Sequence, residues 1–158
     1  MDILDRKILT VLQEDAGLSN AEVADRVGLS PTPCWRRIRS LEETGVIRRR
    51  VALLDRQKLN VDVTVFVAVR TNQHNQEWPD RFARAVDAIP EIVDFYRMAG
   101  DVDYLLRVVV PDIAAYDGVY KRLIASIDIF DVSSTFAMEE IKSTTALPLS
   151  YLKDGPSA

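Results

Sequence analysis

The sequence predicts an α+β protein in which a small helical domain precedes a ferredoxin-like β-α-β-β-α-β domain. Apolar residues in the first sixty positions recur every three or four residues, which is the period of a helix. From Val61 onward they alternate in steps of two, as in a half-buried strand. We expect the helical domain with its linker to span residues 1–60, the second domain to span 61–150, and a tail to follow over 151–158.

The first predicted helix is "MDILDRKILTVLQEDA", in which Leu4, Ile8 and Leu12 lie four residues apart and form one apolar face. A second, short helix begins after Ser19, which stands three residues before Glu22. That spacing is typical of a capping box, in which each side chain accepts a hydrogen bond from the backbone N–H of the other residue.

The third predicted helix begins with two prolines, in "LSPTPCWRRIRSLEETGVIRRR". A turn at Gly28 precedes it, Ser30 is an N-cap candidate, and Pro31 falls at the first helical position, where its missing N–H costs nothing. Pro33 still lies in the first turn, and Gly45 ends the helix. The prolines reduce the freedom of the unfolded chain and so hold the start of this helix in place.

The second block supplies four strands and two helices. The alternating valines of "VDVTVFVAVRT" predict the first strand, with Phe66 on its opposite face, and "EWPDRFARAVDAIP" returns to helical spacing. Two strands follow, "EIVDFYRMAG" and "YLLRVVVP", joined by "GDVD". The helix "DIAAYDGVYKRLIASI", capped by Asp112, and the strand "DVSSTFAMEEIK" complete the unit.

Positive charge gathers at the third helix, although the whole chain has a formal net charge of -4. Residues 1–60 hold 11 Lys and Arg against 9 Asp and Glu, whereas residues 61–158 hold 9 against 15. Three arginines lie on the helix and three in an extended segment behind it: Arg36, Arg37, Arg39, Arg48, Arg49 and Arg50. This asymmetry favours a nucleic acid partner for the first domain, and chance variation of a few charges is the alternative.

Two helices joined by a tight turn and followed by arginines are typical of a winged helix-turn-helix, which places its second helix in the major groove of double-stranded DNA. The N-terminal residues of such a helix meet base edges, while flanking arginines bind phosphates. On this hypothesis the groove side comprises Ser30, Pro31, Thr32, Pro33, Trp35 and Arg36, and the phosphates are bound by Arg39, Arg48, Arg49 and Arg50.

These residues also have structural alternatives. Any one of the arginines could belong to a solvated helix face, and Trp35 could anchor the core against the first helix. Cys34 is best interpreted as a small buried apolar residue, with a redox switch as the alternative.

The composition indicates where the protein is located, and the second block lacks the parts of an enzyme. The chain has one cysteine, no signal peptide and no apolar run long enough to cross a bilayer, so we expect a cytoplasmic protein with no membrane partner. His74, in "NQHNQ", has no second ligand nearby and is expected at the surface. Phosphate-binding and nucleophile motifs are missing, and we therefore expect no catalytic site, no metal and no cofactor.

One turn in the second block, "MAGDVDY", has the chemistry of a small-molecule site. Its glycine and aspartates also suit a hairpin turn for backbone reasons alone, which is the structural alternative. On the functional interpretation, backbone N–H groups exposed at Gly100 would bind a carboxylate, and Asp101 or Asp103 would bind an ammonium group. Together these groups suit a free amino acid.

At this point the sequence resembles the Lrp/AsnC (feast/famine) family of regulators over nearly its whole length. The resemblance rests on "SPTPCWRRIRSLEETGVI", the following "LLD", "AGDVDYLLRV" and "FAMEEIK", which occur in the family's order. The stretches "RMAGDVDYLLRV" and "SSTFAMEEIKSTTALPL" are most similar to the cysteine-responsive, DecR-type branch.

The resemblance implies that the second domain is a RAM/ACT-like module that senses amino acids and forms oligomers. It assigns effector binding between dimers to Gly100, Asp101 and Asp103, with Thr135, Phe136 and Ala137 as the other wall. Cysteine or another sulfur amino acid is the expected effector, with a leucine-type amino acid second. The run "ASIDIFDVSST" departs from the family, because it is one residue shorter and lacks the usual Pro-Gly.

Assembly follows from the expected sheet, whose helices cover only one face. Apolar residues on both faces of the first strand, with Phe66 on the second face, predict a homodimer through the sheets. The resemblance extends this to an octamer, and two-fold symmetry predicts a near-palindromic DNA site.

We therefore expect a sequence-specific, ligand-responsive transcription regulator of amino-acid metabolism. A low-specificity architectural protein that wraps DNA is the first alternative, and a metabolic enzyme on a ferredoxin-like fold is the second.

Overall fold

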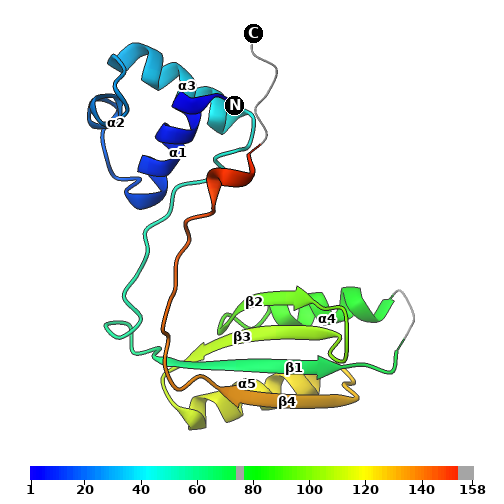
Figure 1. Cartoon of the computed structure of the whole chain (residues 1–158). Helices are drawn as coiled ribbons and strands as arrows, with labels where there is room; N and C mark the ends of the chain where they lie inside the picture. Colours follow the sequence, from blue (N-terminus) through cyan, green and yellow to red (C-terminus); the bar gives the residue numbers. More distant parts are fainter. Residues whose placement is uncertain (74–76, 153–158) are drawn as a thin grey trace. The chain divides into compact units, whose positions relative to one another are not determined.

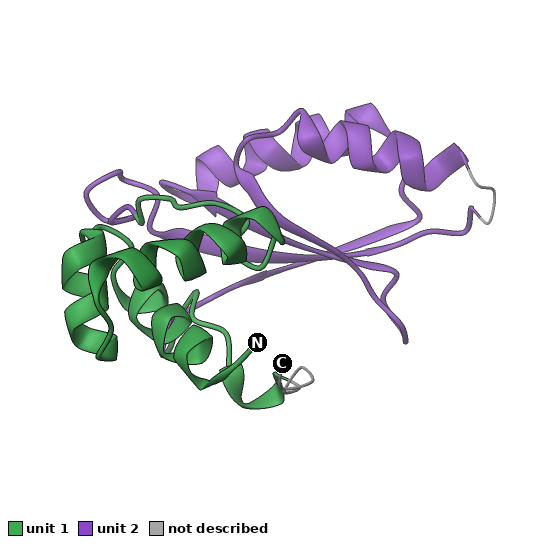
Figure 2. Cartoon of the chain, turned by 90° about the horizontal axis from the view of Figure 1, so that it is seen from above, with its two compact units in different colours: residues 1–53, 142–158 green, residues 54–141 purple. Residues whose placement is uncertain are grey.

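The computed structural model describes residues 1–73 and 77–152, which fall into two compact units. The first unit contains residues 1–53 and the C-terminal segment from Lys142 onward (Figure 2). The second unit contains residues 54–141. The expected surface position of His74 falls outside the described residues.

The first unit is built on three helices, α1 (Ile3–Glu14), α2 (Asn20–Val27) and α3 (Pro31–Glu43) (Figure 1). The capping box of α2 is confirmed, because the Ser19 hydroxyl accepts from the N–H of Glu22 and the Glu22 carboxylate accepts from the N–H of Ser19. A second capping box, between Asp2 and Asp5, opens α1. These caps satisfy N–H groups that a helix leaves free at its first turn.

The turn between α2 and α3 has the features that the sequence predicts. Gly28 adopts a φ of 75°, a left-handed conformation that glycine reaches without strain. Pro31 opens α3, and Ser30 takes the N-cap position without a side-chain capping bond. The amide of Asn20 donates to the carbonyl of Pro31 over 2.8 Å, so the first turn of α3 is also tied to the start of α2.

The three helices share one apolar core. α1 contributes Ile8 and Leu9 as its buried residues, while Leu4 and Leu12 of the expected face are half-buried. The buried stripe of α1 is broader than a single four-residue spacing because both α2 and α3 pack against this helix. The remaining buried members of the core are Val23, Ala24, Val27, Cys34, Ile38 and Leu41.

The C-terminal segment returns to this helical core. The Gln13 side chain both donates to the carbonyl of Leu147 and accepts from its N–H, and a guanidinium N–H of Arg6 donates to the carbonyl of Leu152 over 2.6 Å. Leu149, in a short 3-10 helix (Leu149–Tyr151), packs with Leu152 against the core. The sequence predicts a second domain that extends to residue 150. The contacts of the returning segment join residues more than a hundred positions apart, and no local pattern in the sequence indicates them.

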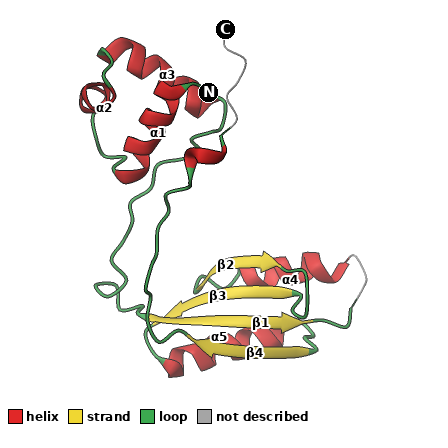
Figure 3. Ribbon diagram, viewed as in Figure 1, coloured by secondary structure: helices red, strands yellow, loops and turns green. Residues whose placement is uncertain are grey.

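The second unit has the expected β-α-β-β-α-β order. Its four strands form one antiparallel sheet in the order β2-β3-β1-β4 (Figure 3). The elements are β1 (Val63–Arg70), α4 (Glu77–Asp87), β2 (Ile92–Arg97), β3 (Tyr104–Val110), α5 (Ile113–Ser126) and β4 (Asp131–Phe136). As expected, the carboxylate of Asp112 caps α5 by accepting from the N–H of Ala115.

Both helices of this unit lie on the same face of the sheet (Figure 2). Alternate residues of β1 and β3 point into that core, which pairs Val65 with Val108 and Val67 with Leu106. The core also holds an aromatic cluster, in which Phe82 packs edge-on against two neighbouring rings. The opposite face of the sheet carries Phe66, Leu105, Arg107 and Val109, which are exposed or half-buried.

We predict that Leu149→Ala loosens the helical unit alone. Removing this half-buried side chain should lower the free energy of unfolding by roughly 1–2 kcal/mol, less than a fully buried leucine would cost. Hydrogen exchange should then accelerate in α1 and stay unchanged in β1 and β3. Leu147→Ala is the control, because the Leu147 side chain is 72% exposed. Equal exchange in both variants would contradict the packing of the return segment.

Candidate DNA interface and effector site

α3 separates its residues into two opposite faces. Successive residues of a helix turn by 100°, so Cys34, Ile38 and Leu41 share one face and are buried in the core. The opposite face is exposed and includes Thr32, Trp35, Arg36 and Arg39. Ser30, Pro31 and Pro33 are exposed at the start of the same helix. The structure thus leaves all the expected groove-side residues exposed, at the start and on the outer face of α3.

Trp35 belongs to this outer surface and is not a core anchor, because it is 49% exposed. The guanidinium of Arg39 lies over its ring, with its central carbon 5.3 Å from the ring centroid. The Nε of Arg39 also donates to the carboxylate of Glu43 over 2.7 Å. Arg39 is therefore held from two sides, by a cation–π contact and by an ion pair.

Arg37 has a structural role instead. Its Nη1 lies 2.8 Å from a carboxylate oxygen of Asp2 and 2.7 Å from one of Asp5, so it joins α3 to the start of α1. The hydrogen bond to Asp5, followed by that to Asp2, raises the pKa of this guanidinium. Sequence reasoning grouped Arg37 with its neighbours, and only its place between the two faces of α3 could have separated it.

Arg48, Arg49 and Arg50 follow the end of α3 in an exposed segment that forms no strand. Arg50 donates to Glu42 over 3.0 Å. Within residues 1–73 and 77–152, Arg48 and Arg49 form no ion pair, and neither does Arg36 on the helix. No carboxylate among these residues therefore balances the charge of the three arginines.

Cys34 is completely buried, as expected. Burial raises the pKa of its thiol, so the reactive thiolate is disfavoured. This environment supports the interpretation of Cys34 as a small apolar core residue.

The second expected site lies at the β2–β3 hairpin. Gly100 has a φ of 125°, which only glycine adopts readily, and the N–H of Met98 donates to the carbonyl of Asp103 over 2.8 Å. One carboxylate oxygen of Asp103 accepts from the N–H of Thr71 over 2.8 Å, so this side chain fixes the segment after β1. Asp101 is exposed. The role of Asp103 in holding the backbone is one that the sequence did not reveal.

The two walls of the expected effector site do not meet within one chain. The N–H of Asp103 donates to the carbonyl of Val69, at the end of β1, whereas the N–H of Ala137 donates to that of Thr64, at its start. Five residues of strand separate these points, which corresponds to about 17 Å. Thr135 and Phe136 pair with the start of β1 as well. A site that uses both walls therefore needs two copies of the chain.

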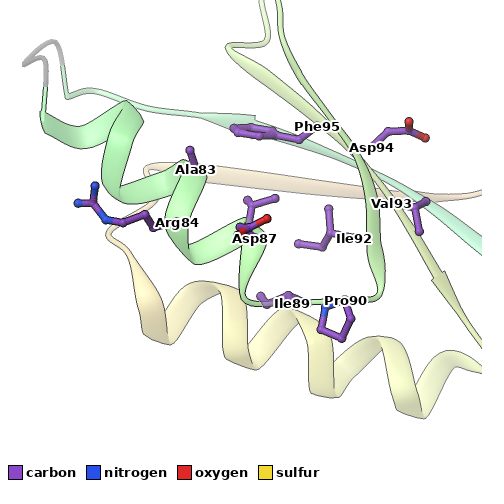
Figure 4. Close-up of a pocket in the computed structure, with 10 residues that line it drawn as sticks. Ala83, Arg84, Asp87, Ile89, Pro90, Ile92, Val93, Asp94 and Phe95 are labelled. Atoms are coloured by element: carbon purple, nitrogen blue, oxygen red, sulfur yellow. The ribbon is translucent and has the colours of Figure 1, made fainter. Parts of the chain in front are cut away.

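A hollow of about 670 Å³ lies between α4 and β2, away from both walls. Its lining is mainly apolar and includes Val86, Ile89, Ile92 and Phe95, while the guanidinium of Arg84 points away from it (Figure 4). It contains none of the expected effector residues. In the described part of the chain, no group of three or more His, Cys, Asp or Glu residues could hold a metal ion.

Family models match both units in turn. Residues 1–48 match a winged helix-turn-helix DNA-binding model, and residues 64–147 match the Lrp/AsnC ligand binding domain. The chain belongs to the Lrp/AsnC family. The resemblance seen in its motifs is confirmed.

Two relatives extend the match over nearly the whole chain. The glutamate uptake regulatory protein of Zymomonas mobilis is 49% identical over 98% of this chain and 94% of its own length. The DNA-binding transcriptional activator DecR of Escherichia coli is 47% identical over 94% of this chain and 99% of its own. The expected likeness to DecR is present, and the likeness to the glutamate uptake regulator is slightly greater.

Solved structures share the fold. An AsnC family transcriptional regulator from Agrobacterium tumefaciens is 67% identical, with a TM-score of 0.95 over 97% of this chain and 100% of its own. A transcriptional regulator from Neisseria meningitidis, solved in complex with L-Met, is 37% identical, with a TM-score of 0.90 over 95% of this chain and 97% of its own.

These matches decide the class of function. The chain is a DNA-binding transcriptional regulator and not an enzyme, since its domains and relatives are those of regulators. The alternative of a low-specificity architectural protein is not favoured. No helix within the described residues is long and apolar enough to span a membrane.

We predict that Arg37→Met lowers the free energy of unfolding by about 1 kcal/mol, because it leaves Asp5 without its cation. The backbone N–H of Asp5, then Arg37, holds the pKa of Asp2 below its ordinary value. A carboxylate with a lowered pKa stabilises the fold above its ordinary pKa and loses that contribution as the pH falls through the lowered value. The difference between Arg37→Met and the wild type should therefore shrink in acid.

The matched control for this experiment is Arg36→Met, which removes an exposed arginine that has no ion pair among the described residues. Its unfolding free energy should stay within about 0.5 kcal/mol of the wild type. Urea unfolding at neutral and acidic pH measures all three proteins. Equal stability of the two variants would show that Arg37 does not join the helices.

Proposed function

We propose that this regulator binds DNA through the exposed face of α3 and the arginines that follow it, and that a free amino acid alters its assembly or its DNA affinity. The observation that carries the DNA part is the division of the arginines. Arg37 is used inside the fold, whereas Arg36, Arg48 and Arg49 remain exposed and without carboxylate partners in the described chain. Unpaired cations at the edges of a groove-binding helix suit phosphates.

The groove side of this proposal consists of the first two turns of α3. Ser30 and the following residues are exposed there, and the Pro31 carbonyl is tied to Asn20, so the helix start is held before DNA arrives. A rigid start reduces the conformational entropy that binding must remove. We assign Ser30, Pro31, Thr32, Pro33, Trp35 and Arg36 to this surface, with Arg39, Arg48, Arg49 and Arg50 beside it.

We predict that Arg49→Ala makes the plot of log DNA affinity against log salt concentration less steep by about 0.9, because one fewer phosphate is neutralised. Arg36→Ala should behave in the same way. Fluorescence anisotropy of labelled DNA at several salt concentrations measures the slope. Arg84→Ala, on α4 of the second unit, removes the same charge and should leave the slope unchanged. An unchanged slope in both test variants would rule out their phosphate contacts.

We assign dimer formation to the sheet face that the helices leave open. Phe66 is 39% exposed there on β1, and Tyr96 is 54% exposed on β2, which β3 separates from β1. A second copy packed against this face would remove these side chains from water. The octamer that the family resemblance implies, a near-palindromic operator and a cytoplasmic location stay parts of this proposal.

The effector site is proposed to form between copies. Gly100, Asp101 and Asp103 of one chain would bind the backbone groups of an amino acid, and residues 135–137 of another chain would form the other wall. Asp103 keeps one carboxylate oxygen without a described partner, and Asp101 is exposed, so both could meet an ammonium group.

A sulfur amino acid is the proposed effector, with cysteine and methionine first and a leucine-type amino acid second. The regulator solved with L-Met, 37% identical to this chain, supports a sulfur amino acid. The 49% identical relative is named for glutamate uptake, which makes glutamate the acidic alternative to include in the same test.

We predict that one amino acid from this group raises the melting temperature of the purified protein. A ligand whose free concentration is about a hundred times its Kd stabilises the folded protein by roughly 2.7 kcal/mol. Asp101→Asn should abolish the selective shift, while Asp117→Asn, at an exposed position of α5, should retain it. A thermal-shift scan over the twenty amino acids measures this. A shift that survives in Asp101→Asn would exclude Asp101 as the group that binds the ammonium.

A further inference from the structure

The structure assigns to Arg39 the direct reading of a guanine base in the major groove, with Trp35 and Glu43 as the residues that position its guanidinium. This inference rests on the proposed binding of DNA through α3. It moves Arg39 from the group expected to bind phosphates to the group that specifies sequence.

The first support is position. Arg39 lies on the exposed face of α3, between the directions of Trp35 and Arg36, and turned well away from the buried stripe. Helical side chains lean toward the N-terminus of their helix, and Arg39 accordingly lies over Trp35, four residues earlier. Its functional group is therefore displaced toward the end of α3 that enters a groove.

The second support is orientation. The Trp35 ring contacts one face of the guanidinium, and Glu43 accepts from its Nε, so the plane and the edge of the group are both restrained. No side chain in the described part of the chain bonds to its two terminal nitrogens. Two parallel N–H donors on a fixed plane match the O6 and N7 acceptors of guanine.

The third support is charge, which distinguishes a base from a phosphate as the partner of Arg39. Both can accept hydrogen bonds from the two terminal nitrogens of a guanidinium. The carboxylate of Glu43 lies 2.7 Å from Nε of Arg39, so the pair has no net charge. A phosphate near this pair would be repelled by Glu43 nearly as much as it is attracted by Arg39. A base edge is neutral and meets no such opposition, whereas Arg36, Arg48 and Arg49 form no ion pair within residues 1–73 and 77–152 and suit phosphates.

The experiment begins by selecting the preferred operator of the wild-type protein from a random DNA library. Affinities of the wild type, Arg39→Ala and Arg49→Ala are then measured for that operator and for each single base-pair change, at two salt concentrations. Arg39→Ala should lose discrimination at one G·C pair in each half-site, by roughly 5- to 150-fold. Its salt slope should stay within the error of the wild type, while Arg49→Ala keeps its base preferences and loses about 0.9 of slope.

The positioning residues have readouts of their own. Trp35→Ala should weaken discrimination at the same G·C pair, and Trp35→Phe should retain most of it, because a phenyl face also stacks on a guanidinium. Glu43→Ala should weaken that discrimination and also make the salt dependence steeper, because Arg39 then carries an uncompensated charge. A residue that only stabilised the helix would not change the slope in this direction.

Two results would overturn the inference. If Arg39→Ala lowers the salt slope by about 0.9 and keeps every base preference, Arg39 binds a phosphate and the proposed function stands. If the wild type binds no DNA, or selects no sequence, the proposed function fails and the inference fails with it. Trp35, Arg39 and Glu43 all lie on the surface of α3, so their variants should fold, and circular dichroism of each should show the helix content of the wild type.

Discussion

The burial of one stripe of α3 is the constraint on which the rest of the DNA-binding unit depends. Cys34, Ile38 and Leu41 must face the core shared with α1 and α2, and this determines which residues of α3 face outward. The caps and the turn at Gly28 set where each helix begins, and the C-terminal return covers part of the same core. The surface that we propose for DNA binding is thus a consequence of how three short helices pack.

Carboxylate partners then divide the arginines of this region into three roles. Arg37 joins two helices, and it is the least exposed of the set that forms ion pairs here. Arg39 pairs with Glu43 and Arg50 with Glu42. These pairs balance the charge of each arginine and restrain the position of its guanidinium. The arginines that form no ion pair in the described part of the chain supply charge. An acidic chain can therefore present a positive surface over a short stretch of sequence, because nearby glutamates pair with only some of the arginines there.

Local signals explain what the sequence predicted well. The Ser19–Glu22 capping box, the start of α3 at Pro31 and the alternation of β1 each depend on residues a few positions apart. The features that escaped prediction depend on distant partners. Asp103 holds Thr71, Arg37 reaches Asp2 and Asp5, and the return segment bonds to Gln13. The separation of the two expected walls of the effector site, at opposite ends of β1, could not be predicted for the same reason.

The measurement that tests the central claim most directly is acrylamide quenching of tryptophan fluorescence with and without DNA. The chain has two tryptophans, of which Trp35 is 49% exposed on α3 and Trp78 is 3% exposed in the sheet domain. Quenching of the free protein therefore reports mainly on Trp35. If DNA lies against the exposed face of α3, saturation with DNA should remove most of this quenching. Anisotropy of labelled DNA establishes that binding is complete. If quenching is then unchanged, DNA binds elsewhere.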